Sequence, residues 1–135
     1  QQLKFKIMSF KSILKVAGKN YNVLSVNYGL FQETDATGRP STVSRGGKID
    51  ITVESTGATD LFEWMTNSFE RKDGSIVFYK RDSEATLKEL KFTESYLVKH
   101  KEKFDSTGEN PLTETFTISA RKLEMGSGAF ENDWV

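Results

Sequence analysis

The residues of this chain that could carry out chemistry are few, and their spacing argues against an enzyme. His100 is the only histidine and there is no cysteine, which excludes histidine-based triads, histidine zinc sites and thiol catalysis. Most carboxylates alternate with lysines, which is typical of solvated surface charge, as at Glu63, Glu70, Glu84 and Glu89. We therefore expect no catalytic residue, metal site or cofactor, and we expect His100 at the surface or in an interface.

Two loops superficially match ligand-binding motifs. Residues 45–48, RGGK, resemble a phosphate loop, but the earlier glycine is missing and Ile49 stands where Ser or Thr is required. Residues 105–110 offer several oxygen atoms, but not at the spacing of a calcium loop, and Pro111 follows them instead of a helix. A loop-to-strand junction and an ordinary turn explain both segments.

A third candidate is a surface for single-stranded nucleic acid, which combines stacking aromatic rings with basic side chains. One segment interleaves these types, at Phe92, Tyr96, Lys99, Lys101 and Lys103. Acidic residues interrupt it, and the chain as a whole carries 19 basic and 19 acidic residues, so no field of one sign attracts nucleic acid or anionic lipid. The apolar runs are far shorter than the roughly 20 residues that span a bilayer. We expect neither a nucleic-acid partner nor membrane insertion.

The elements that must position these side chains are mostly β-strands. Alternating or continuous apolar patterns predict strands over residues 10–16, 21–30, 48–55, 76–81, 85–100 and 112–120. The phase of the segment 85–100 slips near residues 93–95, which indicates two strands or a bulge, and a helix over residues 85–90 competes with this interpretation. Glycine and asparagine in residues 17–20 predict a hairpin, residues 72–75 predict a turn, and residues 126–128 predict a flexible joint before an aromatic tail.

One helix is predicted, over residues 60–69, where Thr59 or Asp60 is suited to the N-cap. Its apolar stripe comprises Leu61, Phe62, Trp64, Met65 and Phe69, which at helical spacing is more typical of a core than of a ligand cavity. The ten Phe, four Tyr and two Trp residues fill a thin core efficiently. The predicted fold is mainly β (α+β), a small antiparallel β-barrel or sandwich with this helix at its flank.

The most informative stretch is a long polar loop over about residues 31–47. Structureless loops of more than about 12–15 residues are uncommon in compact domains and are usually functional or disordered. Because this one lacks apolar groups to fold against its own domain, we expect an extended arm that becomes ordered by docking onto another molecule. The candidate contact residues of this arm are Gln32, Glu33, Thr34, Asp35, Arg39, Pro40, Arg45, Gly46 and Gly47.

The cleanest strand pattern, over residues 112–120, has one face of hydroxyl side chains. Apolar residues alternate there with Thr113, Thr115, Thr117 and Ser119. A polar but uncharged face suits a smooth wall better than a grip on a ligand.

A resemblance rests on these segments taken in order. The chain resembles the Hcp (TssD) tail tube family of bacterial type VI secretion systems from Met8 to Val135. The residues that carry the resemblance read ETDATGRPS, SRGGKI, VESTG, DLFEWM, RKDGSIVFYK, LTETFTISARKLEM and END-W. Residues 1–7 precede the match and have no counterpart in the family, so we interpret them as an extension or remnant before one domain over residues 8–135.

The resemblance implies a barrel with one helix, of which six copies close into a ring, and rings that stack into a tube. It further implies a contractile sheath, a spike and effector proteins as partners. It places the protein in the bacterial cytoplasm as assembled tube, and afterwards outside the cell or in a target cell. The arm would then reach a neighbouring subunit or the next ring, where Arg39 and Arg45 pair with carboxylates and Gly46 and Gly47 let it bend. The hydroxyl face of residues 113–119 would lie at the lumen or between subunits.

A different class of function remains open from the residues themselves. A monomeric barrel that binds a small ligand or a single-stranded nucleic acid, with the arm as a lid, has the same strand pattern. The mass of the native particle separates the two hypotheses, because a ring is several times heavier than one chain.

Overall fold

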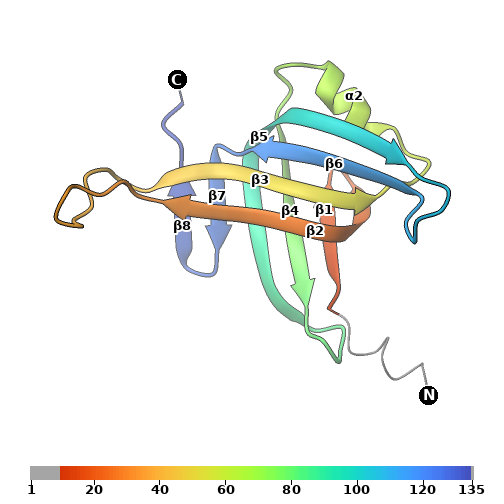
Figure 1. Ribbon diagram of the computed structural model, residues 1–135, viewed down its shortest axis with the longest axis horizontal. Helices are drawn as coiled ribbons and strands as arrows, with labels where there is room; N and C mark the ends of the chain where they lie inside the picture. Colours follow the sequence, from red (N-terminus) through yellow and green to blue (C-terminus); the bar gives the residue numbers. More distant parts are fainter. Residues whose placement is uncertain (1–9, 135) are drawn as a thin grey trace.

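The computed structural model describes residues 10–134, and Figure 1 shows their arrangement. Over these residues the chain is mainly β, as predicted, with one short helix. In chain order the elements are β1 (Ser12–Val16), β2 (Lys19–Phe31), β3 (Arg45–Glu54), α2 (Asp60–Thr66), β4 (Lys72–Tyr79), β5 (Thr86–Phe104), β6 (Leu112–Ser119), β7 (Lys122–Met125) and β8 (Gly128–Glu131). The predicted extension at residues 1–7 lies outside the described residues. No helix within residues 10–134 has the length and apolar character needed to cross a bilayer.

The strands form two antiparallel sheets, and β2 and β5 each pair with strands of both sheets. The strand order is β4-β1-β2-β3-β6-β5-β7-β8, and an additional pairing of β4 with β5 closes the first six strands of this order into a barrel-like sandwich. We call β2, β3, β6 and the second half of β5 the front sheet, and β1, β4, β7, β8 and the first half of β5 the back sheet. The strands of the front sheet run across those of the back sheet, and α2 covers one side of the structure beside β5 (Figure 1).

The change of sheet along β5 takes place at a bulge. Residues of β5 up to Ser95 pair with β4, whereas those from Tyr96 onward pair with β6. Between them Glu94 has a φ of 48°, and its N–H donates to Asp73 Oδ1 at 2.7 Å. A bulge bends a strand and strengthens its twist, so the predicted slip at residues 93–95 is confirmed as a bulge. The competing helix over residues 85–90 is wrong, because this segment is held in the sheet by β4.

The core lies between the sheets and under the helix. Ile49, Ile51 and Val53 of β3 are at most 1% exposed, as the predicted alternation requires. Trp64 is buried too, and its Nε1–H donates to the Glu70 carbonyl at 2.9 Å. The helix ends at Thr66, earlier than predicted, so Phe69 falls outside the apolar stripe and is 84% exposed. Phe62 is also exposed, because a helix of two turns presents only one narrow face to the core.

Three turn predictions are corrected by the register of the strands. Residues 72–75 lie within β4, where they pair with β1 and β5 instead of turning. Residues 126–128 are not a flexible joint, because Met125 pairs with Gly128 in the tight β7–β8 hairpin. The β1–β2 hairpin is confirmed, but Ala17 and Gly18 supply its left-handed conformations, not an asparagine. At residues 72–75 strand pairing outweighs the local turn propensity of glycine, whereas in the two hairpins Gly18 and Gly126 take up left-handed conformations in the turn.

The side chain of His100 is buried within the chain itself, and not at the surface or in an interface as predicted. Its Nε2 lies 2.9 Å from Glu114 Oε1, and the two side chains are 6% and 4% exposed. Both residues point inward, since His100 opposes Phe116 and Glu114 opposes Glu102 across the β5–β6 pair. Ser55 Oγ lies 3.1 Å from the other Glu114 oxygen.

The Glu114 carboxylate also acts on Tyr21. Burial raises the pKa of the Tyr21 hydroxyl to about 12, and the nearby Asp60 and Glu114 carboxylates contribute to this rise.

The buried pair generates a stability prediction. In the variant His100→Ala the Glu114 carboxylate loses its ring partner while remaining buried, so we expect the free energy of unfolding to fall by about 3–5 kcal/mol. The double variant His100→Leu/Glu114→Leu is expected to lose less, because it leaves no buried carboxylate unpaired. Urea denaturation of both proteins measures the difference. A single variant no less stable than the double variant would contradict the structural role assigned to the pair.

Gly46 and Gly47 do not form the predicted bend of the arm, because both lie within β3. Gly47 has a φ of 104°, and a Cβ there would lie 2.5 Å from Asn132 Nδ2 and 2.9 Å from the Ala120 carbonyl oxygen. Asn132 Nδ2 donates to the Gly46 and Ala120 carbonyls at 3.2 and 3.0 Å. Glycine is needed here so that the C-terminal segment can approach β3 closely.

This close approach generates a second stability prediction. Gly47→Ala combines an unfavourable φ with displacement of Asn132, and we expect it to lower the free energy of unfolding by about 2 kcal/mol or more. Gly57→Ala is the matched control, since nothing lies within 4 Å of its added methyl group, and we expect a change within about 0.5 kcal/mol. Equal midpoints for the two variants in chemical denaturation would refute the packing argument.

Candidate functional site

The arm between β2 and β3 is a small hairpin that projects from one end of the front sheet (Figure 1). Its tip is organised by Asp35, whose Oδ1 accepts the Thr37 N–H at 2.9 Å, the Thr37 hydroxyl at 2.8 Å and the Arg39 N–H at 3.1 Å. The hydroxyl of Thr37 and the backbone N–H of Arg39 hold the pKa of this exposed carboxyl below its usual value. Backbone bonds close the stem, from Asp35 N to Arg39 O at 2.8 Å and from Ser41 N to Glu33 O at 2.7 Å. The arm is therefore ordered by its own hydrogen bonds, and docking is not required to order it.

Six of the nine predicted arm residues lie in this hairpin, between the ends of β2 and β3. Thr34 pairs with Pro40 in an isolated bridge, and Gln32 Nε2 donates to the Thr42 carbonyl at 2.9 Å. Arg45 Nη2 lies 3.7 Å from Glu33 Oε1, with both side chains more than half exposed. Such a surface pair contributes little stability, so Arg45 can exchange its partner at low cost. The three remaining residues, Arg45, Gly46 and Gly47, belong to β3.

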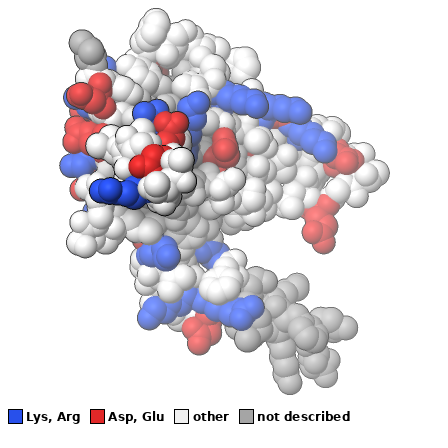
Figure 2. All heavy atoms as spheres, turned by 60° about the vertical axis from the view of Figure 1, so that its left-hand side comes forward, with Lys and Arg blue, Asp and Glu red and all other residues white. Residues whose placement is uncertain are grey.

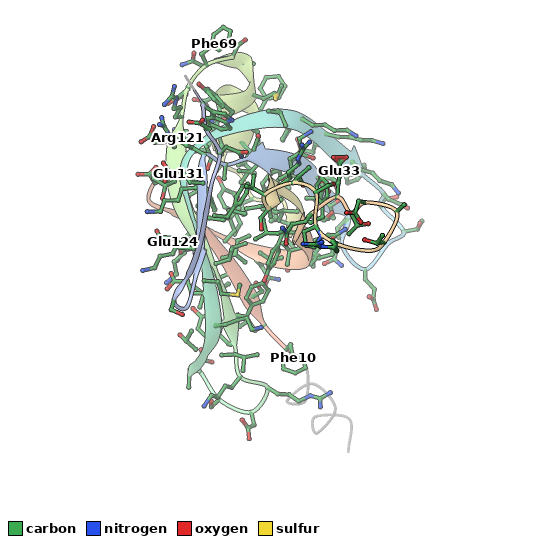
Figure 3. All side chains as sticks on the ribbon, turned by 90° about the vertical axis from the view of Figure 1, so that its left-hand side faces the viewer. Phe10, Glu33, Phe69, Arg121, Glu124 and Glu131 are labelled. Atoms are coloured by element: carbon green, nitrogen blue, oxygen red, sulfur yellow. The ribbon has the colours of Figure 1, made fainter. Side chains whose placement is uncertain are left out.

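The base of the arm carries apolar side chains that the sequence interpretation overlooked. Leu30 is 52%, Phe31 58% and Val43 80% exposed. The expectation that this loop lacks apolar groups is therefore wrong for its base, although it holds for the polar tip. In Figure 3 the hairpin near Glu33 faces the viewer, and in Figure 1 it extends beyond the end of the front sheet.

The outward face of the front sheet is a polar wall, and the four predicted hydroxyl residues lie in it. Ser119, Thr117, Thr115 and Thr113 stand opposite Lys48, Asp50, Thr52 and Glu54 of β3. The Thr117 hydroxyl donates to Asp50 Oδ1 at 2.6 Å, and the Thr52 and Thr115 hydroxyls lie 3.1 Å apart. Glu54 accepts a hydrogen bond from the Asn22 amide of β2. The neutral and acidic groups of this wall thus satisfy one another.

The same wall includes a row of lysines on β5. Lys99, Lys101 and Lys103 stand opposite Thr117, Thr115 and Thr113 of β6, and all three are exposed. Figure 2 shows a line of basic side chains along this part of the surface. The aromatic partners expected for nucleic-acid stacking lie elsewhere, since Phe92 is 1% exposed in the core and Tyr96 packs on Trp134 with ring centroids 5.3 Å apart. Strand phase turns Phe92 into the core, whereas Tyr96 has the outward phase of the lysines but is engaged by Trp134.

Exposed apolar side chains surround the polar wall without interrupting it. Leu24 and Val98 occupy bulges in β2 and β5, the two lateral strands of the front sheet, and are 38% and 46% exposed. At the end away from the arm, Phe104 and Leu112 are 70% and 36% exposed. A bulge shifts the side-chain phase by one residue, which places an apolar residue at an edge that alternation would make polar.

A largely apolar groove follows the free edge of β2. One part, of about 460 Å³, lies between residues 28–30 and the β7–β8 hairpin, and a second part, of about 440 Å³, lies between residues 23–26 and the start of β1. β1 pairs with β2 only as far as Asn22, so the backbone of residues 23–31 is unpaired on this side. An unpaired edge beside an apolar groove is able to receive another strand.

The C-terminal segment is fixed beside the bulge in β5. Arg71 donates to Glu94 at 2.7 Å and to the Tyr96 hydroxyl at 2.9 Å. Arg121 lies between Glu94 and Glu131, with nitrogen-to-oxygen distances of 3.5 and 3.7 Å, and Figure 3 shows Arg121 and Glu131 on the same side. Together with the packing of Trp134 on Tyr96, these contacts hold the tail against the sheet.

Comparisons with known proteins agree with this geometry. The family model described as hemolysin coregulated protein Hcp (TssD) matches residues 8–135, whereas no curated protein sequence matches the chain. Hcp1 from Flavobacterium johnsoniae has 71% identity and a TM-score of 0.87, over 90% of this chain and 99% of that chain. Hcp1 from Salmonella typhimurium has 16% identity and a TM-score of 0.73, over 91% and 92% of the two chains. A chain of the sheath-tube complex of an extracellular contractile injection system, PVC, shares the fold with 19% identity and a TM-score of 0.54, over 87% and 89%. The chain belongs to the hemolysin coregulated protein Hcp (TssD) family, the tube proteins of type VI secretion.

Proposed function

We propose that this chain forms hexameric rings that stack into the inner tube of a type VI secretion system, through which effectors are carried or exported. The observation that carries the proposal is the placement of exposed apolar side chains around a polar wall. Leu24 and Val98 mark the two lateral edges, while Phe31 and Phe104 mark the two ends. Apolar patches rimmed by polar surface are typical of protein contacts, so contacts at the perimeter leave the polar wall facing a water-filled bore.

Ring closure follows from the two lateral edges. The edge of β2 with its groove and the edge of β5 near Val98 are different surfaces, so a contact between them is heterologous and propagates from copy to copy. A heterologous contact whose rotation closes produces a ring without free edges. The hydroxyl residues of β6 then lie in the middle of the lumen wall.

Stacking follows from the two ends. The arm and its apolar base project at one end of the front sheet, and the β5–β6 turn lies at the other end (Figure 1). Asp105 organises that turn by accepting the Thr107 N–H and hydroxyl at 3.1 and 2.8 Å, which agrees with the predicted ordinary turn. Contact between the arm of one ring and the opposite end of the next would bury Phe31 and Val43 against Phe104 and Leu112.

The proposed partners follow from the tube. A chain of similar fold occurs in a sheath-tube complex, which supports a contractile sheath around this tube, with a spike at its tip and effectors as cargo. The protein would assemble in the bacterial cytoplasm and leave the cell when the sheath contracts. This function is structural and needs no catalysis, nucleic acid or membrane insertion.

The alternative, a monomeric binding barrel with the arm as a lid, has less support. The groove that would hold a ligand is lined by residues of the sheets and of the β7–β8 hairpin, and the residues of the arm beyond Leu30 do not line it. The arm projects away from the barrel (Figure 1).

The arm can be tested by reversal of its charges. Arg39→Glu and Arg45→Glu are expected to leave the unfolding midpoint unchanged, because both side chains are solvated, yet to suppress assembly by removing cations from the contact. Sedimentation velocity and negative-stain imaging measure the assembly. Lys15→Glu on the back sheet is the control with the same charge change. Normal rings and tubes from both arm variants would show that the arm does not make the contact.

The lateral edge can be tested separately from the wall. Val98→Asp places a charge in the proposed contact between neighbours, and we expect the native mass to fall to that of one chain, 15.3 kDa. Thr115→Asp adds the same charge to the middle of the wall, where we expect the ring mass to persist. Native mass spectrometry distinguishes the two. If Thr115→Asp loses its rings and Val98→Asp keeps them, the polar wall makes the contact between copies and the edge of β5 does not.

A further inference from the structure

The polar wall contains one set of charges that the protein itself leaves unpaired. Within residues 10–134, the salt bridges do not include Lys99, Lys101 or Lys103. Residues two apart on one strand face are about 7 Å apart, so this lysine row places like charges close together. Like charges on one face repel each other, and their proximity suggests a role outside the folding of the chain.

The acidic groups of the wall do not neutralise the row. Asp50 accepts the Thr117 hydroxyl at 2.6 Å, and Glu54 accepts the Asn22 amide. Both lie on β3, so β6 separates them from the lysines of β5. Glu102, the acidic residue between the lysines on β5, belongs to the opposite phase and lies 2.6 Å from Ser55 Oγ. The ammonium groups therefore remain available to a molecule in front of the wall.

We infer that the lysine row binds protein cargo through acidic surface patches of that cargo. The inference rests on the proposed function, in which each copy turns this wall toward the bore. Closure repeats the row around the bore, where charges of one sign reinforce each other. A folded protein fits better than a single-stranded nucleic acid, because bases need exposed rings on which to stack. The ring in the phase of the wall, that of Tyr96 opposite Ser119, is already packed on Trp134. The hydroxyl groups beside the lysines can donate to carboxylates as well.

The test uses the full chain and a matched pair of probes. One probe is a small designed helical bundle with glutamates on its surface, and the other is the same bundle with glutamines. Binding to rings is measured by sedimentation at low and at high salt, after native mass spectrometry has established the mass of every variant. We expect the glutamate probe alone to bind, and salt to weaken its binding.

Two triple variants, which remove the same number of positive charges, then test the lysine row. Lys99→Gln/Lys101→Gln/Lys103→Gln should bind the glutamate probe about tenfold more weakly. The control Lys15→Gln/Lys19→Gln/Lys91→Gln, made at exposed positions elsewhere on the molecule, should bind it as the unchanged chain does.

The outcomes separate the inference from the proposed function. Rings that bind both probes equally, or a triple variant no weaker than its control, would overturn the inference and leave the tube intact. Binding of labelled oligo(dT) through the same lysines, tighter than that of the glutamate probe, would also overturn it in favour of nucleic acid. An unchanged chain that forms no ring would instead refute the proposed function and, with it, the bore on which the inference depends.

Discussion

The structure depends on the bend by which the long strand β5 passes from one sheet to the other. β5 pairs with β4 and β7 through its first half and with β6 through its second half. A regular strand cannot serve two crossing sheets, so the chain bends at Glu94, whose φ of 48° is unfavourable for a residue other than glycine. The Asp73 carboxylate and the Arg71 guanidinium hold this conformation at 2.7 Å each. Local strain is thus compensated by side chains from the neighbouring strand.

The bend determines which surfaces remain for contact. The second half of β5 joins β6, β3 and β2 in a sheet whose inward residues fill the core and whose outward residues form the polar wall. Because side chains alternate along a strand, a continuous wall leaves no place for apolar contact except at bulges and strand ends. Leu24, Val98, Phe31 and Phe104 occupy such places. One topological feature therefore separates a solvated face from a perimeter suited to assembly.

Sequence reasoning succeeded where one physical pattern dominates a segment. Alternation predicted the buried face of β3 and the hydroxyl face of β6, and the loss of phase at residues 93–95 predicted the bulge. It failed where tertiary contacts override local preference. Residues 72–75 are of types common in turns, but they pair with β1 on one side and with β5 on the other. Gly47 was expected to let the arm bend, but it lets Asn132 pack closely against β3. The inward position of Glu114, in the phase of Phe116 and Ile118, was a signal that would have predicted a buried partner such as His100.

By itself the sequence determined the β class, the faces of the strands, the polar arm and the family resemblance, because these depend on the order of residues along short segments. Only the tertiary structure decided that His100 and Glu114 meet in the core, that the arm is ordered by Asp35, and that the lysines of β5 share a wall with the hydroxyls of β6. These features join residues that are distant in the chain or depend on backbone geometry. Their positions follow from sheet register and from the bend in β5, which no local pattern specifies.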